Sequence, residues 1–304
     1  MTTIGSLLLL PESPEKSGGK VDLRGAIVLA VGLALPLFGI SKAATWGWGD
    51  ERTLGMIFGG LLVLSAWVQL ESRTAEPLAN IAVLRSRPIL ITNLATAPIG
   101  FGALAVFVVV PQLAEAPTST GYGFGLTAAH AGLLLLPASL VIAVVGPLSG
   151  FVGARIGNKV PILIGGVVTA FGGALLAFDH GSQLGVVLYS SIAFAGLSFA
   201  FATSVNAIID AAPPAQSGEA TGINAVVFRA GSAVGAQVSG TLLAASALNG
   251  ASRPTDGGFR DAFLALAAAG LAAAALAAFL PPRGRPARVR STAAELLASE
   301  AGRG

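Results

Sequence analysis

Eight stretches of this chain contain no lysine, arginine, aspartate or glutamate, and this pattern constrains the fold more than any other feature. The stretches are residues 25–41, 53–70, 88–114, 116–154, 160–178, 180–209, 230–252 and 262–282. Each approaches or exceeds the roughly 20 residues that a helix needs to cross the hydrocarbon core of a bilayer. The longest run must also contain a loop, for which residues 116–127, rich in glycine, are suited. We therefore predict an all-α integral membrane protein with about eight transmembrane helices, over residues 24–42, 53–70, 89–112, 128–152, 160–178, 184–209, 221–247 and 262–280.

Composition excludes several classes of protein. The chain is 54% hydrophobic and only 11% charged, whereas soluble domains are about 25% charged. The net charge of +3 is diffuse and forms no basic face, so nucleic-acid binding is not expected. There is no cysteine, which excludes disulfides and thiolate metal sites. The sequence has no phosphate-binding loop, no zinc-protease motif and no polar catalytic cluster, so we expect no enzyme, no metal and no cofactor.

The basic residues predict the orientation of the helices. Eight spans would put both termini on one side of the membrane. That side holds thirteen basic residues: Lys16, Lys20, Arg24, Arg73, Arg85, Arg87, Arg155, Lys159, Arg283, Arg285, Arg288, Arg290 and Arg303. The opposite loops hold four, which are Lys42, Arg52, Arg253 and Arg260. Because basic loops stay in the cytoplasm, both termini are predicted to be cytoplasmic, in a multi-pass protein of the cell (inner) membrane.

Residues 71–88 differ from the spans around them. The segment is charged, and Leu78, Ile81 and Leu84 follow a helical spacing. This is typical of an amphipathic helix on the cytoplasmic face, and it separates the first two spans from the following six. The start of the chain lacks the features of a secretory signal, and residues 281–304 read as a basic cytoplasmic tail.

The turn GFVGARIGNK, residues 150–159, joins two apolar runs and carries two positive charges. One interpretation is a basic loop that only obeys the orientation rule. The other rests on a resemblance: the turn is similar to the glycine-aspartate-arginine-glycine loop of the major facilitator superfamily, in its degenerate C-terminal copy. Gly150, Arg155, Gly157 and Lys159 match that pattern, whereas Ala154 stands where the family has aspartate. The charge pair that locks the inward gate in a full copy therefore cannot form in the same way.

Further segments, in order along the chain, resemble the fourteen-span drug:proton antiporters of that superfamily. They are LLLLPES (7–13), WGWGD (46–50), EPLANIAVLRSRP (76–88), VPQ (110–112), AGLLLLP (131–137) and SGEATGINAVVFRAGSAVG (217–235). The resemblance implies a major-facilitator-type bundle divided into five parts. These are the end of a preceding helix and a cytoplasmic loop (1–20), two inserted helices (21–70), a linker (71–88), a C-terminal six-helix half (89–280) and the tail (281–304).

The resemblance also implies the function. Such a protein exports amphipathic drugs or other small organic compounds by proton antiport through alternating access, with the proton gradient as its energy source. Its partners are the lipid bilayer, the small-molecule substrate and an N-terminal six-helix half that this chain lacks. A fragment, a truncated gene product and one half of a split transporter all remain open. The alternatives from other classes are a non-transporting membrane scaffold or regulator, and an integral membrane enzyme.

A few polar residues lie inside the predicted spans and are candidates for the substrate path. They are Asn93, Gln112, Asn206, Asn224 and Arg229. Hydrogen bonds between helices are the alternative role for the uncharged ones. Arg229 could instead extend toward the cytoplasm, to Asp210 or Glu219. His130 invites a proton-relay role, but a single histidine at a helix start is more often an interface residue.

Small residues and prolines also recur in the spans. Gly231, Gly235 and Ser239 are four residues apart and predict a face for close helix packing, as do Gly165, Thr169 and Gly173. Pro98, with Gly100 and Gly102, is expected to interrupt the third span, and Pro137 and Pro147 the fourth. Such breaks suit gating movements around a central cavity, although static kinks are the alternative.

Overall fold

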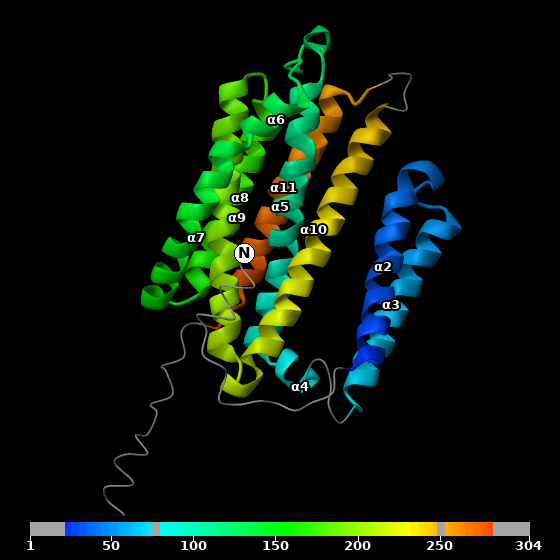
Figure 1. Ribbon diagram of the computed structural model, residues 1–304, viewed down its shortest axis with the longest axis vertical. Helices are drawn as coiled ribbons and strands as arrows, with labels where there is room; N and C mark the ends of the chain where they lie inside the picture. The colour runs from blue at the N-terminus through cyan, green and yellow to red at the C-terminus, as the bar shows by residue number, and fades with distance from the viewer. Residues whose placement is uncertain (1–21, 75–79, 248–252, 282–304) are drawn as a thin grey trace, which may run out of the picture.

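The computed structural model describes residues 22–74, 80–247 and 253–281, and all regular elements in these ranges are helices (Figure 1). The predicted all-α architecture is confirmed for this part of the chain. The predictions for residues 1–20, and for the tail from residue 282 onward, lie outside the described residues. Between residues 71 and 88 the described part holds one short helix, α4 (Ile81–Leu84).

Within the described ranges, seven segments are long and apolar enough to cross a membrane. They lie in α2 (Leu23–Trp46), α3 (Glu51–Glu71), α5 (Arg87–Glu115), α6 (Ala128–Leu134) with α7 (Leu136–Ile156), α8 (Lys159–Phe178), α9 (Gln183–Ala211) and α11 (Asp256–Ala278). The eighth predicted span lies in α10 (Ser217–Ala247), which is long enough but less apolar. Glycine, serine, threonine and amide side chains interrupt its aliphatic residues.

Two prolines behave differently from one another. The span predicted over 128–152 is divided at Leu135, where α6 ends and α7 begins. Pro137 explains the division, because it lacks an amide proton and its ring would clash with the preceding turn of a continuous helix. The third span was expected to be interrupted at Pro98, and this expectation was wrong. α5 runs unbroken through Pro98 and Pro111 for 29 residues. The expected break at Pro147 is also absent, because α7 runs through this residue.

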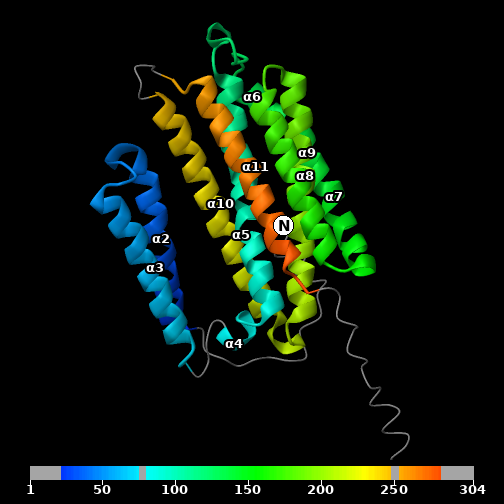
Figure 2. The same ribbon diagram turned by 180° about the vertical axis from the view of Figure 1, so that it is seen from behind.

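The helices form a bundle with a hairpin at its side. α8 packs on α9 and α11, and α5 packs on the same two helices. α7 packs on α9, and α10 packs on α5. The α2–α3 hairpin contacts the rest through α10, on the side of the bundle away from α7, as both views show (Figures 1 and 2).

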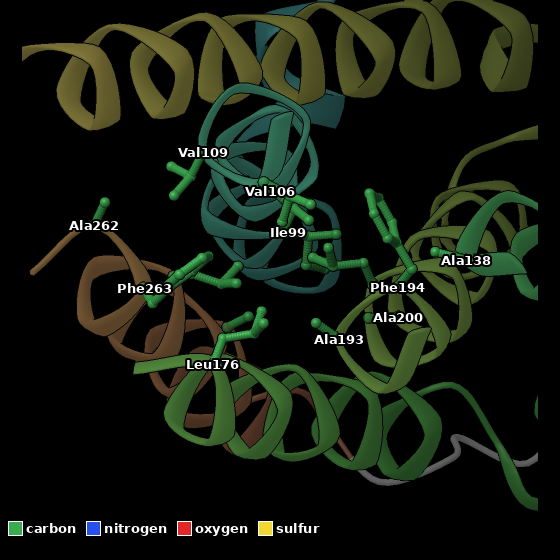
Figure 3. Packing of buried hydrophobic residues seen from close by; sticks show 14 of the residues in the cluster. Ile99, Val106, Val109, Ala138, Leu176, Ala193, Phe194, Ala200, Ala262 and Phe263 are labelled. Carbon is green, nitrogen blue, oxygen red and sulfur yellow. The ribbon is translucent and has the colours of Figure 1, made fainter. Parts of the chain in front are cut away.

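The core lies between α5, α8, α9 and α11 (Figure 3). Phe194 of α9, Phe263 of α11 and Leu176 of α8 are almost completely buried there, with Ile99 and Val106 of α5. Lipid gives no hydrophobic drive for helix association, so close packing must hold these helices together.

Glycines on two faces of α8 allow that packing. A Cβ atom built at Gly165 would lie 2.6 Å from the carbonyl oxygen of Gly196 on α9. One built at Gly173 would lie 2.8 Å from the amide nitrogen of Ala267 on α11. α8 therefore meets both neighbours backbone to backbone.

Candidate functional site

α5 and α10 meet through glycines. A Cβ atom at Gly231 would lie 2.1 Å from the carbonyl oxygen of Ala97, and one at Gly235 would lie 2.1 Å from that of Phe101. From the other side, a Cβ atom at Gly100 would lie 2.2 Å from the carbonyl oxygen of Phe228. The two backbones are in direct contact, so none of these positions has room for a side chain.

Ser239, the third member of the small-residue stripe, is also fully buried. Its hydroxyl oxygen has no hydrogen-bond partner among the described residues. The stripe on α10 therefore provides close contact at its glycines rather than a hydrogen bond at its serine.

A buried polar cluster lies at the same interface, toward the start of α5. The Asn224 amide nitrogen donates to Oδ1 of Asn93 and to Oγ1 of Thr96, both at 2.9 Å. The Thr96 hydroxyl donates in turn to the carbonyl oxygen of Thr92. Asn224 and Thr96 are fully buried, and Asn93 is 9% exposed. Oδ1 of Asn224 has no partner among the described residues, so the cluster keeps one acceptor unused.

The turn between α7 and α8 connects four helices. Gly157 ends α7 with φ 86° and ψ 164°, a region that is essentially restricted to glycine. The side chain of the next residue, Asn158, donates to Oδ2 of Asp210 near the end of α9, at 2.8 Å. Nζ of Lys159 donates to the carbonyl oxygen of Ala278 at the end of α11, at 2.6 Å. The turn therefore holds the ends of α9 and α11 to the α7–α8 junction.

The other two residues of the turn motif lie on α7. A Cβ atom at Gly150 would be 3.4 Å from the amide nitrogen of Asn206 on α9. Asn206 thus lies against α7, while Asn93 and Asn224 pair with each other at the α5–α10 interface. The Arg155 guanidinium lies 5.3 Å from the centre of the Phe151 ring, one turn back on the same helix.

Arg229 and Gln112 stand apart from the polar cluster. Arg229 is exposed and lies 5.9 Å from the centre of the Phe228 ring. Neither carboxylate suggested for it forms an ion pair with it: Asp210 accepts from Asn158, and Glu219 accepts from the backbone amide of Asn80. Gln112 is exposed and donates to the carbonyl oxygen of Val108 on its own helix, at 3.2 Å.

Some polar contacts between helices were not predicted from the sequence, and the one made by His180 is buried. His180 follows α8 and is buried, with Nδ1 2.8 Å from the carbonyl oxygen of Leu176 and Nε2 2.9 Å from Oδ1 of Asp256. It joins the α8–α9 connection to the start of α11. The only sign of this contact in the sequence is that His180 follows Asp179, in the short loop between two predicted spans. His130, which the sequence did single out, is exposed and bonds Thr127 at the start of α6.

Among the described residues, no three histidine or acidic side chains gather closely enough to hold a metal ion. What the arrangement offers is a set of closely packed apolar helices, a buried amide cluster and a turn that couples helix ends. These features hold a bundle of membrane helices together.

The model of the Major Facilitator Superfamily matches residues 92–302, which is more than half of the chain. The chain therefore belongs to the Major Facilitator Superfamily, a family of multi-pass membrane transporters and not of enzymes.

Its relatives include several drug and antibiotic exporters. The chain is 28% identical to the tetracenomycin C resistance and export protein of Streptomyces glaucescens, over 79% of this chain and 44% of that protein. It is 25% identical to the multidrug resistance protein Stp of Mycobacterium tuberculosis, over 79% and 44%. It is 29% identical to the cephamycin export protein CmcT of Amycolatopsis lactamdurans, over 88% and 54%. The chain thus spans about half the length of the curated relatives it matches.

Proposed function

We propose that this chain is part of a proton-coupled exporter of amphipathic drugs or other small organic compounds, with the architecture of the fourteen-span antiporters. The match over residues 92–302 carries the proposal, together with relatives that are named for resistance and export. Transport proceeds by alternating access, in which helices rock around a central cavity.

In this proposal, residues 21–70 are the two inserted helices and residues 89–280 are the C-terminal six-helix half, joined by the linker 71–88. Two observations support the division. The α2–α3 hairpin contacts the remaining helices mainly through α10. The coverage of about half of each relative fits a chain that corresponds to one part of such a transporter.

The exposed face of α7 fits a partner half or lipid. Leu140, Val144, Leu148 and Phe151 follow one another at helical spacing, and each is more than half exposed. The substrate cavity of a two-half transporter lies between such faces. In the complete protein, the half-buried Asn206 would then be reached from the cavity, and the α7–α8 turn would act as a gate.

A second candidate is a non-transporting membrane scaffold or regulator built on the same bundle. A scaffold or regulator transports nothing, so substitutions that spare the fold but disturb the gate would change no efflux. In a transporter the same substitutions would lower efflux. A transport assay on such variants therefore separates the two functions.

Gly157→Leu is expected to lower efflux about fivefold or more in the complete transporter while expression stays near normal. Leucine at a φ of 86° and ψ of 164° costs about 1–3 kcal/mol, and the strain falls on the turn that joins the ends of four helices. The measurement is uncoupler-sensitive efflux of a fluorescent dye from cells. Gly181→Leu is the matched control, because a Cβ atom there meets no atom within 4 Å. Unchanged efflux in Gly157→Leu would mean that the turn over residues 150–159 is only a basic loop and has no gating role.

The proposed orientation, with both termini in the cytoplasm, predicts which residues an impermeant thiol reagent reaches in intact cells. The chain has no cysteine, so single cysteines can be introduced freely. Cysteine at Trp48 or Arg253 should be labelled from outside, and cysteine at Lys159 only after the cells are permeabilised. Labelling of Lys159→Cys in sealed cells would overturn the orientation.

A further inference from the structure

An apolar cavity of about 710 Å³ lies between the α2–α3 hairpin and helices α5, α10 and α11. Its wall includes Leu33 of α2, Trp67 of α3, Phe101 of α5, Val226 of α10, and Ala268 and Ala272 of α11. Cavities of this size hold ligands with the bulk of a drug or a folded acyl chain. The lining alone selects only for an apolar body.

Arg229 adds a charge at the edge of this cavity. It lines a smaller hollow of about 350 Å³, which shares Leu33, Val226 and Ala230 with the large cavity. Arg229 lies about 18 Å along α10 from the first residue of that helix, well within the length that crosses the bilayer. Among the described residues no carboxylate forms an ion pair with it, and its contact is with the Phe228 ring. A charged side chain at such depth is costly unless an opposite charge meets it.

We infer that the two hollows form one binding site for an amphipathic organic anion of the fatty-acid class. The carboxylate lies on Arg229, whose planar guanidinium suits two parallel hydrogen bonds to a carboxylate. The hydrocarbon body fills the cavity between the hairpin and α10. Charge selects for the anion, and the apolar wall excludes small hydrophilic anions.

This site goes beyond the proposed function. It lies between the α2–α3 hairpin and helices α5, α10 and α11, within one chain, and not between two transporter halves. Binding there therefore requires no second half, no proton gradient and no transport. The binding site can be absent while the proposed transport function holds. The site can equally be present while the proposed transport function fails.

Trp67 supplies the test, because it forms part of the cavity wall. The other two tryptophans, Trp46 and Trp48, are replaced by phenylalanine, so that Trp67 is the only tryptophan of the chain. The chain is purified in a neutral detergent and titrated with dibrominated stearic acid, whose bromine atoms quench a nearby indole. We expect saturable quenching by the acid at neutral pH. The methyl ester of the same acid, which lacks the charge, should bind about tenfold more weakly or worse.

Variants then test whether Arg229 provides the positive charge that binds the carboxylate. Arg229→Gln is expected to remove the preference for the acid over the ester, and Arg229→Lys to retain part of it. The matched control is Arg260→Gln, since Arg260 also stacks over a phenylalanine, Phe178, but near the start of α11 and away from the cavity. Circular dichroism confirms that each variant keeps its helix content.

A further pair of variants tests whether the hydrocarbon body of the ligand lies in the cavity. Ala268→Phe should weaken quenching by both the acid and the ester, because Ala268 is exposed toward the space it lines. Leu271→Phe, an exposed position of α11 outside the lining, should change neither.

Three results would overturn the inference. They are equal affinity for the acid and the ester, an acid preference that survives in Arg229→Gln, and quenching that never saturates. Tighter quenching by a brominated anionic phospholipid than by the acid would also overturn it, because the occupant would then be a bilayer lipid.

Discussion

Replacing Gly231 by alanine is expected to lower the thermal unfolding midpoint of the chain by about 5–10 °C. The added methyl carbon would lie 2.1 Å from the carbonyl oxygen of Ala97, so α5 and α10 must separate to admit it. Separation also loosens the hydrogen bonds of Asn224 to Asn93 and Thr96, which cross the same interface. Circular dichroism or light scattering of the detergent-solubilised chain during heating measures the midpoint.

The same helix provides a control for this substitution. Gly240 also lies within α10, but a Cβ atom there meets no heavy atom within 4 Å. Alanine favours a helix over glycine by about 1 kcal/mol, so Gly240→Ala should leave the midpoint unchanged or raise it. The two substitutions are chemically identical and should act in opposite directions. Equal midpoints for the two variants would mean that α5 and α10 do not meet at Gly231.

The spans were the part of the fold that the sequence predicted best. Charge-free runs of about 20 residues leave few alternatives in a membrane protein, and the long helices lie within a few residues of the predicted positions. The ends were less predictable: α10 begins at Ser217 and not at residue 221, and α11 begins at Asp256 and not at residue 262. Helix ends outside the apolar core depend on capping, such as the Thr255 side chain that accepts from the amide of Gly258.

Contacts between helices could be predicted only by type. The spacing of Gly231 and Gly235 indicated a packing face, but which helix would lie against it depends on the arrangement of the whole bundle. The amides Asn93 and Asn224 were both candidates, and nothing in their positions, 131 residues apart, showed that they pair. The bond between His180 and Asp256, which are 76 residues apart, was not predicted either.

Proton coupling presents a separate difficulty for this chain. It needs an ionisable group inside the membrane whose proton affinity differs between the two access states. The acidic residues described in α5 to α11 all lie at or near helix ends. They are Glu115, Asp179, Asp210, Glu219, Asp256 and Asp261. In the proposed architecture, the coupling carboxylates belong to the N-terminal half.

The chain by itself is therefore expected to drive no uphill transport at all. It should insert into a bilayer and bind ligands weakly, but the cavity between two halves would be open to lipid on one side. A transporter that works as a single bundle would behave in the opposite way.

Liposomes that contain only this chain give the most direct test of the account. A pH gradient is imposed and a fluorescent cationic dye is followed, with protein-free liposomes in parallel as the baseline. We predict no dye accumulation above this baseline with this chain, at any size of gradient. Accumulation by this chain alone that follows the gradient and disappears with an uncoupler would contradict it, and would place the coupling site within these helices.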